Sequence, residues 1–204
     1  MTDHMVHTEH IDRETGKLGM WIFLFTEMFL FGGLFLVYAV MRVKYADDFH
    51  IAANDLNTFI GTLNTVFLLT SSMTIAMAIT AIQKNERNLV LFLIAVTLLL
   101  AALFMLDKYI EWSHEFKNHI YPGSKVLKNL PHGQLLFFGL YFMMTGLHAL
   151  HVFVGMILLT INLVKVKTGS VNHEYYLLLE NSGLYWHLVD LIWIFLFPLL
   201  YLVT

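Results

Sequence analysis

Two ionisable side chains, His187 and Asp190, lie inside an otherwise apolar stretch near the end of the chain. The stretch covers residues 185–193 and carries Trp186 and Trp193 on either side of them. A charged group in the middle of a membrane costs roughly 2.5–3.5 kcal/mol on insertion scales, so such groups usually face protein, water or a partner. Because they are three residues apart, they share one helix face, and we expect them to hydrogen-bond or to pair.

Two further carboxylates belong to apolar segments elsewhere in the chain. Glu27 lies in the first such segment, where loss of water disfavours the charged form of a carboxyl group. It is therefore a candidate for proton exchange or for contact with a lipid headgroup; the alternative is a carboxyl satisfied by Thr26 or by a neighbouring helix. Glu180 comes two helical turns before His187 and shares a similar face near the membrane surface.

The histidines His148 and His151 are three residues apart in another apolar segment. This spacing could support metal or haem ligation, and a haem held by His187 together with His148 or His151 is one alternative. Hydrogen bonding between helices is the other, and we favour it. The chain has no cysteine and no His-Glu-x-x-His motif, so we expect no metal site on it.

The composition places the chain in the membrane. Of its 204 residues 58% are hydrophobic and only 13% are charged, whereas soluble domains carry about 25% charged residues. The apolar residues form long blocks, as in multi-pass membrane proteins. The formal net charge of −3 is too small to indicate a nucleic-acid partner.

These blocks predict an all-α membrane helix bundle over residues 18–204, preceded by a polar N-terminal tail over residues 1–17. The five expected transmembrane helices cover residues 18–41, 57–82, 89–106, 134–164 and 183–203. The short polar turn at residues 83–88 predicts an antiparallel hairpin. A more polar helical segment follows the third span. We expect Glu111 to lie at interfacial depth, where it could contact a partner or lipid, and Glu115 to lie on the solvated surface.

Five spans place the two termini on opposite sides of the membrane. The 12 Lys and Arg residues divide equally between the two sides, six and six, so the positive-inside rule does not decide the orientation by count. Its greater weight on short loops favours a cytoplasmic N-terminus.

Several small or polar residues are candidates for helix packing. Gly32, Gly33, Gly146 and Gly155 would let a second helix approach closely. Asn64 belongs to a row of Asn, Ser and Thr residues in the second span, and we expect this row to hydrogen-bond to neighbouring helices.

Five motifs occur in an order that identifies a family resemblance. They are Gly19-Met20-Trp21 with Thr26-Glu27 and Phe31-Gly32-Gly33, then Leu63-Asn64-Thr65, Tyr109-Ile110-Glu111-Trp112, Thr145-Gly146-Leu147-His148-Ala149-Leu150-His151-Val152, and Glu180 followed by Tyr185-Trp186-His187-Leu188-Val189-Asp190-Leu191-Ile192-Trp193. In this order they resemble subunit III of the haem–copper oxidases, in its five-helix bacterial form. The resemblance covers nearly all of residues 18–204.

The resemblance implies a non-catalytic subunit of a respiratory terminal oxidase, the enzyme that reduces O2 to water and couples this to proton translocation. Subunit III of this family carries no redox centre; haem and copper belong to the partner subunits. It packs directly against subunit I, in a complex with subunit II and others, binds phospholipid in a helix cleft and supports proton uptake. Glu27 would be the carbodiimide-reactive membrane carboxylate. The expected location is the bacterial cytoplasmic membrane, with the N-terminus cytoplasmic and the C-terminus periplasmic.

Alternatives remain within the family and outside it. The family includes cytochrome c oxidases, quinol oxidases and proteins associated with nitric oxide reductase, and Glu27 and Glu180 favour the cytochrome c branch. A b-type membrane cytochrome or a proton-coupled transporter using Glu27 and Asp190 would be a different class of protein. Transporters commonly contain inverted repeats and broken helices, and the sequence shows neither.

Overall fold

The computed structural model of the chain describes residues 2–54, 56–117, 119–121, 123–124, 127 and 130–202, with side chains from residue 14 onward. The described residues form helices α1 (Thr2–Lys44), α2 (Ala46–Asn54), α3 (Thr58–Gln83), α4 (Arg87–Lys117), α6 (His132–Thr168) and α7 (Leu177–Tyr201). All of these except α2 are long and apolar enough to cross a membrane. The predicted all-α class with five spans is confirmed. A helix suits this setting because it satisfies its backbone hydrogen bonds internally, where lipid offers none.

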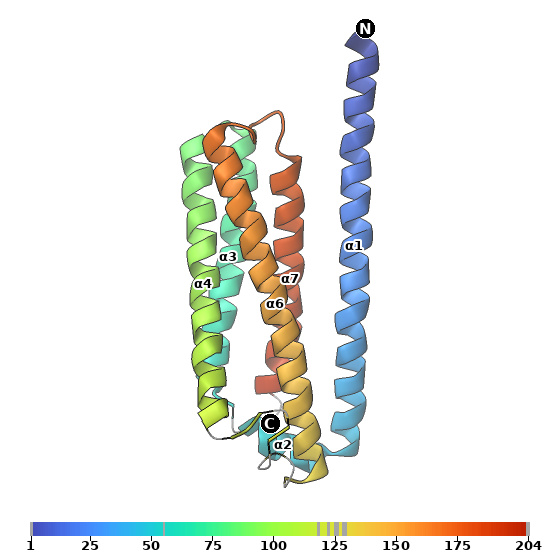
Figure 1. Ribbon diagram of the computed structural model, residues 1–204, viewed down its shortest axis with the longest axis vertical. Helices are drawn as coiled ribbons and strands as arrows, with labels where there is room; N and C mark the ends of the chain where they lie inside the picture. Colours follow the sequence, from blue (N-terminus) through green and yellow to red (C-terminus); the bar gives the residue numbers. More distant parts are fainter. Residues whose placement is uncertain are drawn as a thin grey trace.

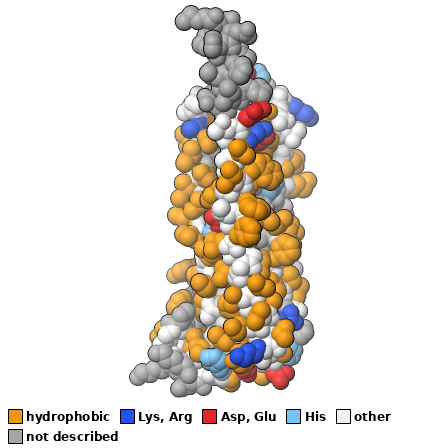
Figure 2. Space-filling model, turned by 90° about the vertical axis from the view of Figure 1, so that its right-hand side faces the viewer, with side chains coloured by type: hydrophobic (Ala, Val, Ile, Leu, Met, Phe, Trp, Pro, Cys, Tyr) orange, Lys and Arg blue, Asp and Glu red, His pale blue; other side chains and the backbone are white. Residues whose placement is uncertain are grey.

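Helices α3, α4, α6 and α7 form a bundle, and α1 runs along its edge (Figure 1). Helix α1 packs against α6 and α7, whereas the short α2 lies across one end of the molecule. The N-terminus and the C-terminus lie at opposite ends, as an odd number of spans requires (Figure 1). Figure 2 shows hydrophobic side chains over the central band of one face, with most Lys, Arg, Asp and Glu near its two ends.

The turn between α3 and α4 confirms the predicted hairpin. Asn85 adopts a left-handed backbone conformation with φ 62°, which lets the chain reverse within a few residues. Arg87, the first residue of α4, donates a hydrogen bond to the carbonyl of Lys167 near the end of α6. This contact ties the hairpin to α6, which ends at Thr168 and is capped by Gly169, where φ is 84°.

Two segments are more helical than the sequence suggested. Helix α1 begins at Thr2, so the polar segment expected as a tail continues the first span. Residues 46–54, which fall between the first two expected spans, form α2. Asp48 of α2 accepts a hydrogen bond from the backbone N–H of Gly133 (3.1 Å) at the start of α6, where it satisfies one of the free N–H groups of that terminus. A Cβ atom at Gly133 would lie only 2.4 Å from Asp48.

The glycines differ in how closely other helices approach them. A Cβ atom at Gly155 would lie 2.7 Å from the ring of Trp186, so α6 and α7 need glycine there. At Gly146 the nearest contact would be an ordinary 3.4 Å to Trp112. The expectation of close packing at Gly32 and Gly33 is not met within the described chain: both are exposed, and a Cβ would meet nothing within 4 Å. They lie on the side of α1 that faces away from α6 and α7.

Candidate functional site

The contact between α1 and α6 contains a carboxylate and an imidazole. Glu27 Oε2 lies 2.9 Å from His151 Nε2, and the other ring nitrogen, Nδ1, lies 2.7 Å from the carbonyl oxygen of Leu147. A carbonyl only accepts hydrogen bonds, so Nδ1 carries a proton. The Glu27–His151 contact can therefore hold its proton in two ways, as a carboxyl donating to a neutral ring or as a carboxylate accepting from an imidazolium.

The Glu27–His151 contact lies near the surface of the bundle. The side chains of Glu27 and His151 are 15% and 12% exposed. The ring of Phe31 lies edge-on to the imidazole at 5.3 Å, and the hydroxyl of Tyr185 donates to the His151 carbonyl (3.1 Å). Thr26, considered as a partner for Glu27, donates instead to the carbonyl of Phe23. The pair is thus held by a neighbouring helix but remains reachable from outside the bundle.

A second link joins α1 to the bundle nearer the N-terminus. Lys17 Nζ lies 2.8 Å from Glu180 Oε1 on α7, and Asn181 donates to the carbonyl of Gly16 (3.4 Å). Glu180 had been expected on the same face as His187; its contact is directed across to α1. The ion pair is partly exposed, so its main effect is to fix how α1 lies against α7.

The expected pairing of His187 with Asp190 is not formed. Ser72 on α3 lies 2.6 Å from His187 Nδ1, and this is the hydrogen bond that His187 makes. Asp190 is buried, with 3% of its surface exposed, and its carboxylate oxygens have no hydrogen-bond partner among the described residues. The physical reason is that α3 packs against α7 and offers a hydroxyl across the interface, which competes with a neighbour on the same helix.

The two tryptophans of α7 bind to the polar row of α3. Trp186 donates to Ser71 (2.9 Å) and Trp193 donates to Thr65 (3.0 Å). Both indole rings are fully buried, so each hydrogen bond satisfies a donor that would otherwise be costly. Asn64 is also fully buried, and its amide has no partner among the described residues. The polar row thus joins α3 to α7, although several of its hydroxyls donate to their own helix.

A buried polar cluster that the sequence analysis did not assemble lies between α4, α6 and α7. Lys108 donates to Glu111 (3.0 Å) and to the hydroxyl of Tyr201 (2.6 Å). The hydroxyls of Tyr141 and Tyr201 both donate to the other carboxylate oxygen of Glu111. The ammonium group of Lys108 also lies 4.7 Å from the ring centre of Trp193. We call these residues, apart from Trp193, the Lys108–Glu111 cluster.

This cluster corrects two expectations about the segment after the third span. Glu111 was expected to face a partner or lipid, but it is 6% exposed and its carboxylate binds within the chain. Glu115, expected on the solvated surface, is 5% exposed. The cause is that α4 continues to Lys117 and still packs against α6 at this depth. The spacing of Lys108 and Glu111, three residues apart on the face that carries Phe104, was the available signal.

The three histidines considered as haem ligands have separate surroundings. His148 is fully buried between the rings of Phe104 (5.6 Å) and Trp193 (5.1 Å), and its nitrogens have no partner among the described residues. His151 binds Glu27 and His187 binds Ser72, as described above. Within the described part of the chain, no group of three or more His, Asp or Glu side chains is placed to hold a metal ion.

The fold defines a multi-pass helical membrane protein, and comparison with known proteins gives its family. A family model for cytochrome c oxidase subunit III matches residues 2–204. The chain belongs to the cytochrome c oxidase subunit III family, whose members are subunits of respiratory haem–copper oxidases.

Several relatives are similar over most of the chain. Cytochrome c oxidase subunit 3 of Thermostichus vulcanus is 31% identical and aligns over 92% of this chain and 87% of its own length. Cytochrome bo(3) ubiquinol oxidase subunit 3 of Buchnera aphidicola is 29% identical, over 93% and 95%. Heme-copper oxidase subunit I+III of Aeropyrum pernix is also 29% identical, over 92% of this chain but 22% of that larger protein. The relatives thus include both cytochrome c and quinol oxidase subunits at similar identity.

Proposed function

We propose that this chain is the non-catalytic subunit III of a bacterial cytochrome c oxidase, carrying neither haem nor copper itself. The match to the family over residues 2–204 is the observation that supports this most strongly. The relative named subunit I+III supports direct packing of this chain against subunit I, because fusion of two chains keeps them side by side. Subunit II and the haem and copper centres of the partners complete the complex.

The Glu27–His151 contact is the group that we assign to proton exchange and lipid contact. It lies between α1 and α6 within the spans, and both side chains keep some exposure. The proton of this contact can lie on the Glu27 carboxyl group or on the His151 imidazole. The pair can therefore exchange a proton without leaving a carboxylate or an imidazolium without its partner. We propose that this pair supports proton uptake by the oxidase and contacts a phospholipid bound beside α1.

The other polar residues named from the sequence hold helices together in this proposal. Glu111 binds within the Lys108–Glu111 cluster, Glu180 binds Lys17 and His187 binds Ser72. His148 and Asp190 are enclosed by the bundle. In this family the N-terminus would be cytoplasmic and the C-terminus periplasmic, across the bacterial cytoplasmic membrane.

Purification of the chain from its native membrane in mild detergent tests the proposal. We expect a large partner and an oxidase difference spectrum to copurify, and we expect this chain to be colourless once separated. Oxidation of reduced cytochrome c by the complex would support the cytochrome c branch; oxidation of quinol alone would assign it to the quinol branch. A haem spectrum that stays with the isolated chain would overturn the proposal and make it a b-type cytochrome.

A further inference from the structure

A groove lies between α3 and the start of α4. It has a volume of about 360 Å³ and is lined by Met73, Met77 and Ala81 of α3 and by Leu89 and Leu93 of α4. Helix α1 packs against α6, α7 and α2, and it stands on the other side of the bundle from α4 (Figure 1). The groove is therefore separate from the Glu27–His151 contact between α1 and α6.

The length of the groove matches one leaflet of a bilayer. Its α3 wall runs from Met73 to Lys84, which at about 1.5 Å per residue spans about 16 Å. The hydrocarbon core of a bilayer is about 30 Å thick, so the groove extends from one surface to about the middle. Its inner part is apolar, and Met73 and Met77 are 64% and 45% exposed. An acyl chain of one lipid fits this depth and this apolar lining.

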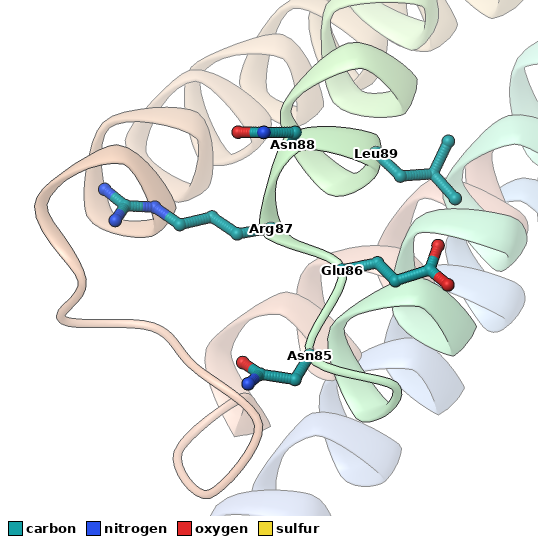
Figure 3. Close-up of a pocket in the computed structure, with 5 residues that line it drawn as sticks. All are labelled: Asn85, Glu86, Arg87, Asn88 and Leu89. Carbon is teal, nitrogen blue, oxygen red and sulfur yellow. The ribbon is translucent and has the colours of Figure 1, made fainter.

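The outer end of the groove carries one charge of each sign. Lys84 caps the C-terminus of α3, and Glu86 lies in the turn before α4; both line the groove. Figure 3 shows Glu86 and Leu89 on one side of the turn, whereas Asn85 and Arg87 point to the other. Arg87 is already bound to the carbonyl of Lys167. The first N–H groups of α4 add positive potential at the same depth.

We propose that this groove binds one phospholipid with an ethanolamine-type headgroup, whose phosphate contacts Lys84 and whose ammonium contacts Glu86. A primary ammonium can donate hydrogen bonds to the Glu86 carboxylate, which a quaternary ammonium cannot do. A headgroup with only negative charge would place like charge against Glu86. The acyl chain would lie along Met73, Met77 and Leu93. The proposed site needs the charges of both Lys84 and Glu86, and removing each of them should change lipid binding in a different way.

Native mass spectrometry of the intact oxidase with added phosphatidylethanolamine, phosphatidylcholine or phosphatidylglycerol tests this site. In Lys84→Ala we expect about tenfold weaker binding of all three lipids, the loss of one charge-assisted contact to phosphate. In Glu86→Gln we expect weaker binding of phosphatidylethanolamine alone, so its preference over phosphatidylcholine disappears. Lys165→Ala and Glu174→Gln remove charges elsewhere near the same end of the bundle and should leave all three affinities unchanged.

Two results would overturn this site. The first is equal binding of the three lipids by wild type, Glu86→Gln and the control variants. The second is a cryo-EM map of the complex that shows a helix of another subunit in the groove. Both are distinct from failure of the proposed function, because neither Lys84 nor Glu86 has a role in that proposal. An oxidase spectrum and normal assembly in the two variants would show this independence.

Discussion

The Glu27–His151 contact and the Lys108–Glu111 cluster use similar chemistry in different places. Each contains a carboxylate and a basic side chain at about the same distance, 2.9 and 3.0 Å, but Glu27 and His151 lie on different helices whereas Lys108 and Glu111 both lie on α4. The first pair is 15% and 12% exposed and links α1 to the bundle. The second is 5% and 3% exposed and lies among α4, α6 and α7. Depth of burial, more than the residue types, separates the two.

This difference has an energetic consequence. A buried ion pair holds its structure firmly because removal of one partner leaves the other charge without compensation. The Glu27–His151 contact also has a form in which a neutral carboxyl donates to an uncharged imidazole, so replacing Glu27 by a neutral hydrogen-bonding side chain need not leave a buried charge without compensation. We therefore assign the inner cluster to stability and the outer pair to exchange with its surroundings.

The largest effect is expected from Glu111→Leu. It leaves the Lys108 ammonium buried and removes the acceptor for the Tyr141 and Tyr201 hydroxyls, so we expect a loss of about 3–5 kcal/mol in the free energy of unfolding. The double variant Lys108→Met with Glu111→Leu should recover much of this loss. Thermal unfolding of the purified complex, followed on this chain, measures both. Equal losses in the single and double variants would contradict the role of the charge pair.

A smaller effect is expected where α7 supports the outer pair. Gly155→Ala places a Cβ atom against Trp186, next in sequence to Tyr185, whose hydroxyl binds the His151 carbonyl. Overpacking of this kind costs about 1–3 kcal/mol. Gly32→Ala is the matched control, because its added methyl meets nothing, and it should be neutral or slightly stabilising. Similar melting temperatures for the two variants would show that α6 and α7 have room to adjust.

Neutralising the outer pair should disturb stability less than breaking the inner cluster. Glu27→Gln keeps a side chain that can still hydrogen-bond to His151, so we expect a change of about 1 kcal/mol. The yield of assembled complex and its unfolding midpoint would report this. A loss as large as that of Glu111→Leu would remove the distinction between the two regions.

The smallest effect is expected at the Lys17–Glu180 ion pair. Its side chains are 38% and 27% exposed, and pairs of this kind contribute about 0–1 kcal/mol. Lys17→Met should leave the unfolding midpoint nearly unchanged and should be less sensitive to salt than wild type. A marked loss of complex would mean that the attachment of α1 depends on this pair.

The spans were predictable because long apolar runs in a membrane must be helical, and the hairpin at Asn85 followed from its short polar turn. The hydrogen-bond partners of the polar residues were harder to predict from the sequence. His187 hydrogen-bonds to Ser72 on α3 instead of Asp190 on its own helix. Glu111 is buried because α4 remains packed against the bundle beyond the apolar run. Spacing along one helix gives the face of a side chain; which helix covers that face depends on tertiary packing.

Labelling of the intact oxidase with a hydrophobic carbodiimide tests the distinction between the two regions most directly. The reagent reacts with a protonated carboxyl that it can reach from lipid. We predict that wild type and Glu111→Gln are labelled equally on this chain, at Glu27, and that Glu27→Gln is not labelled while its assembly remains intact. Undiminished labelling of Glu27→Gln, or mapping of the label to Glu111, would contradict the assignment of the outer pair to exchange and the inner cluster to structure.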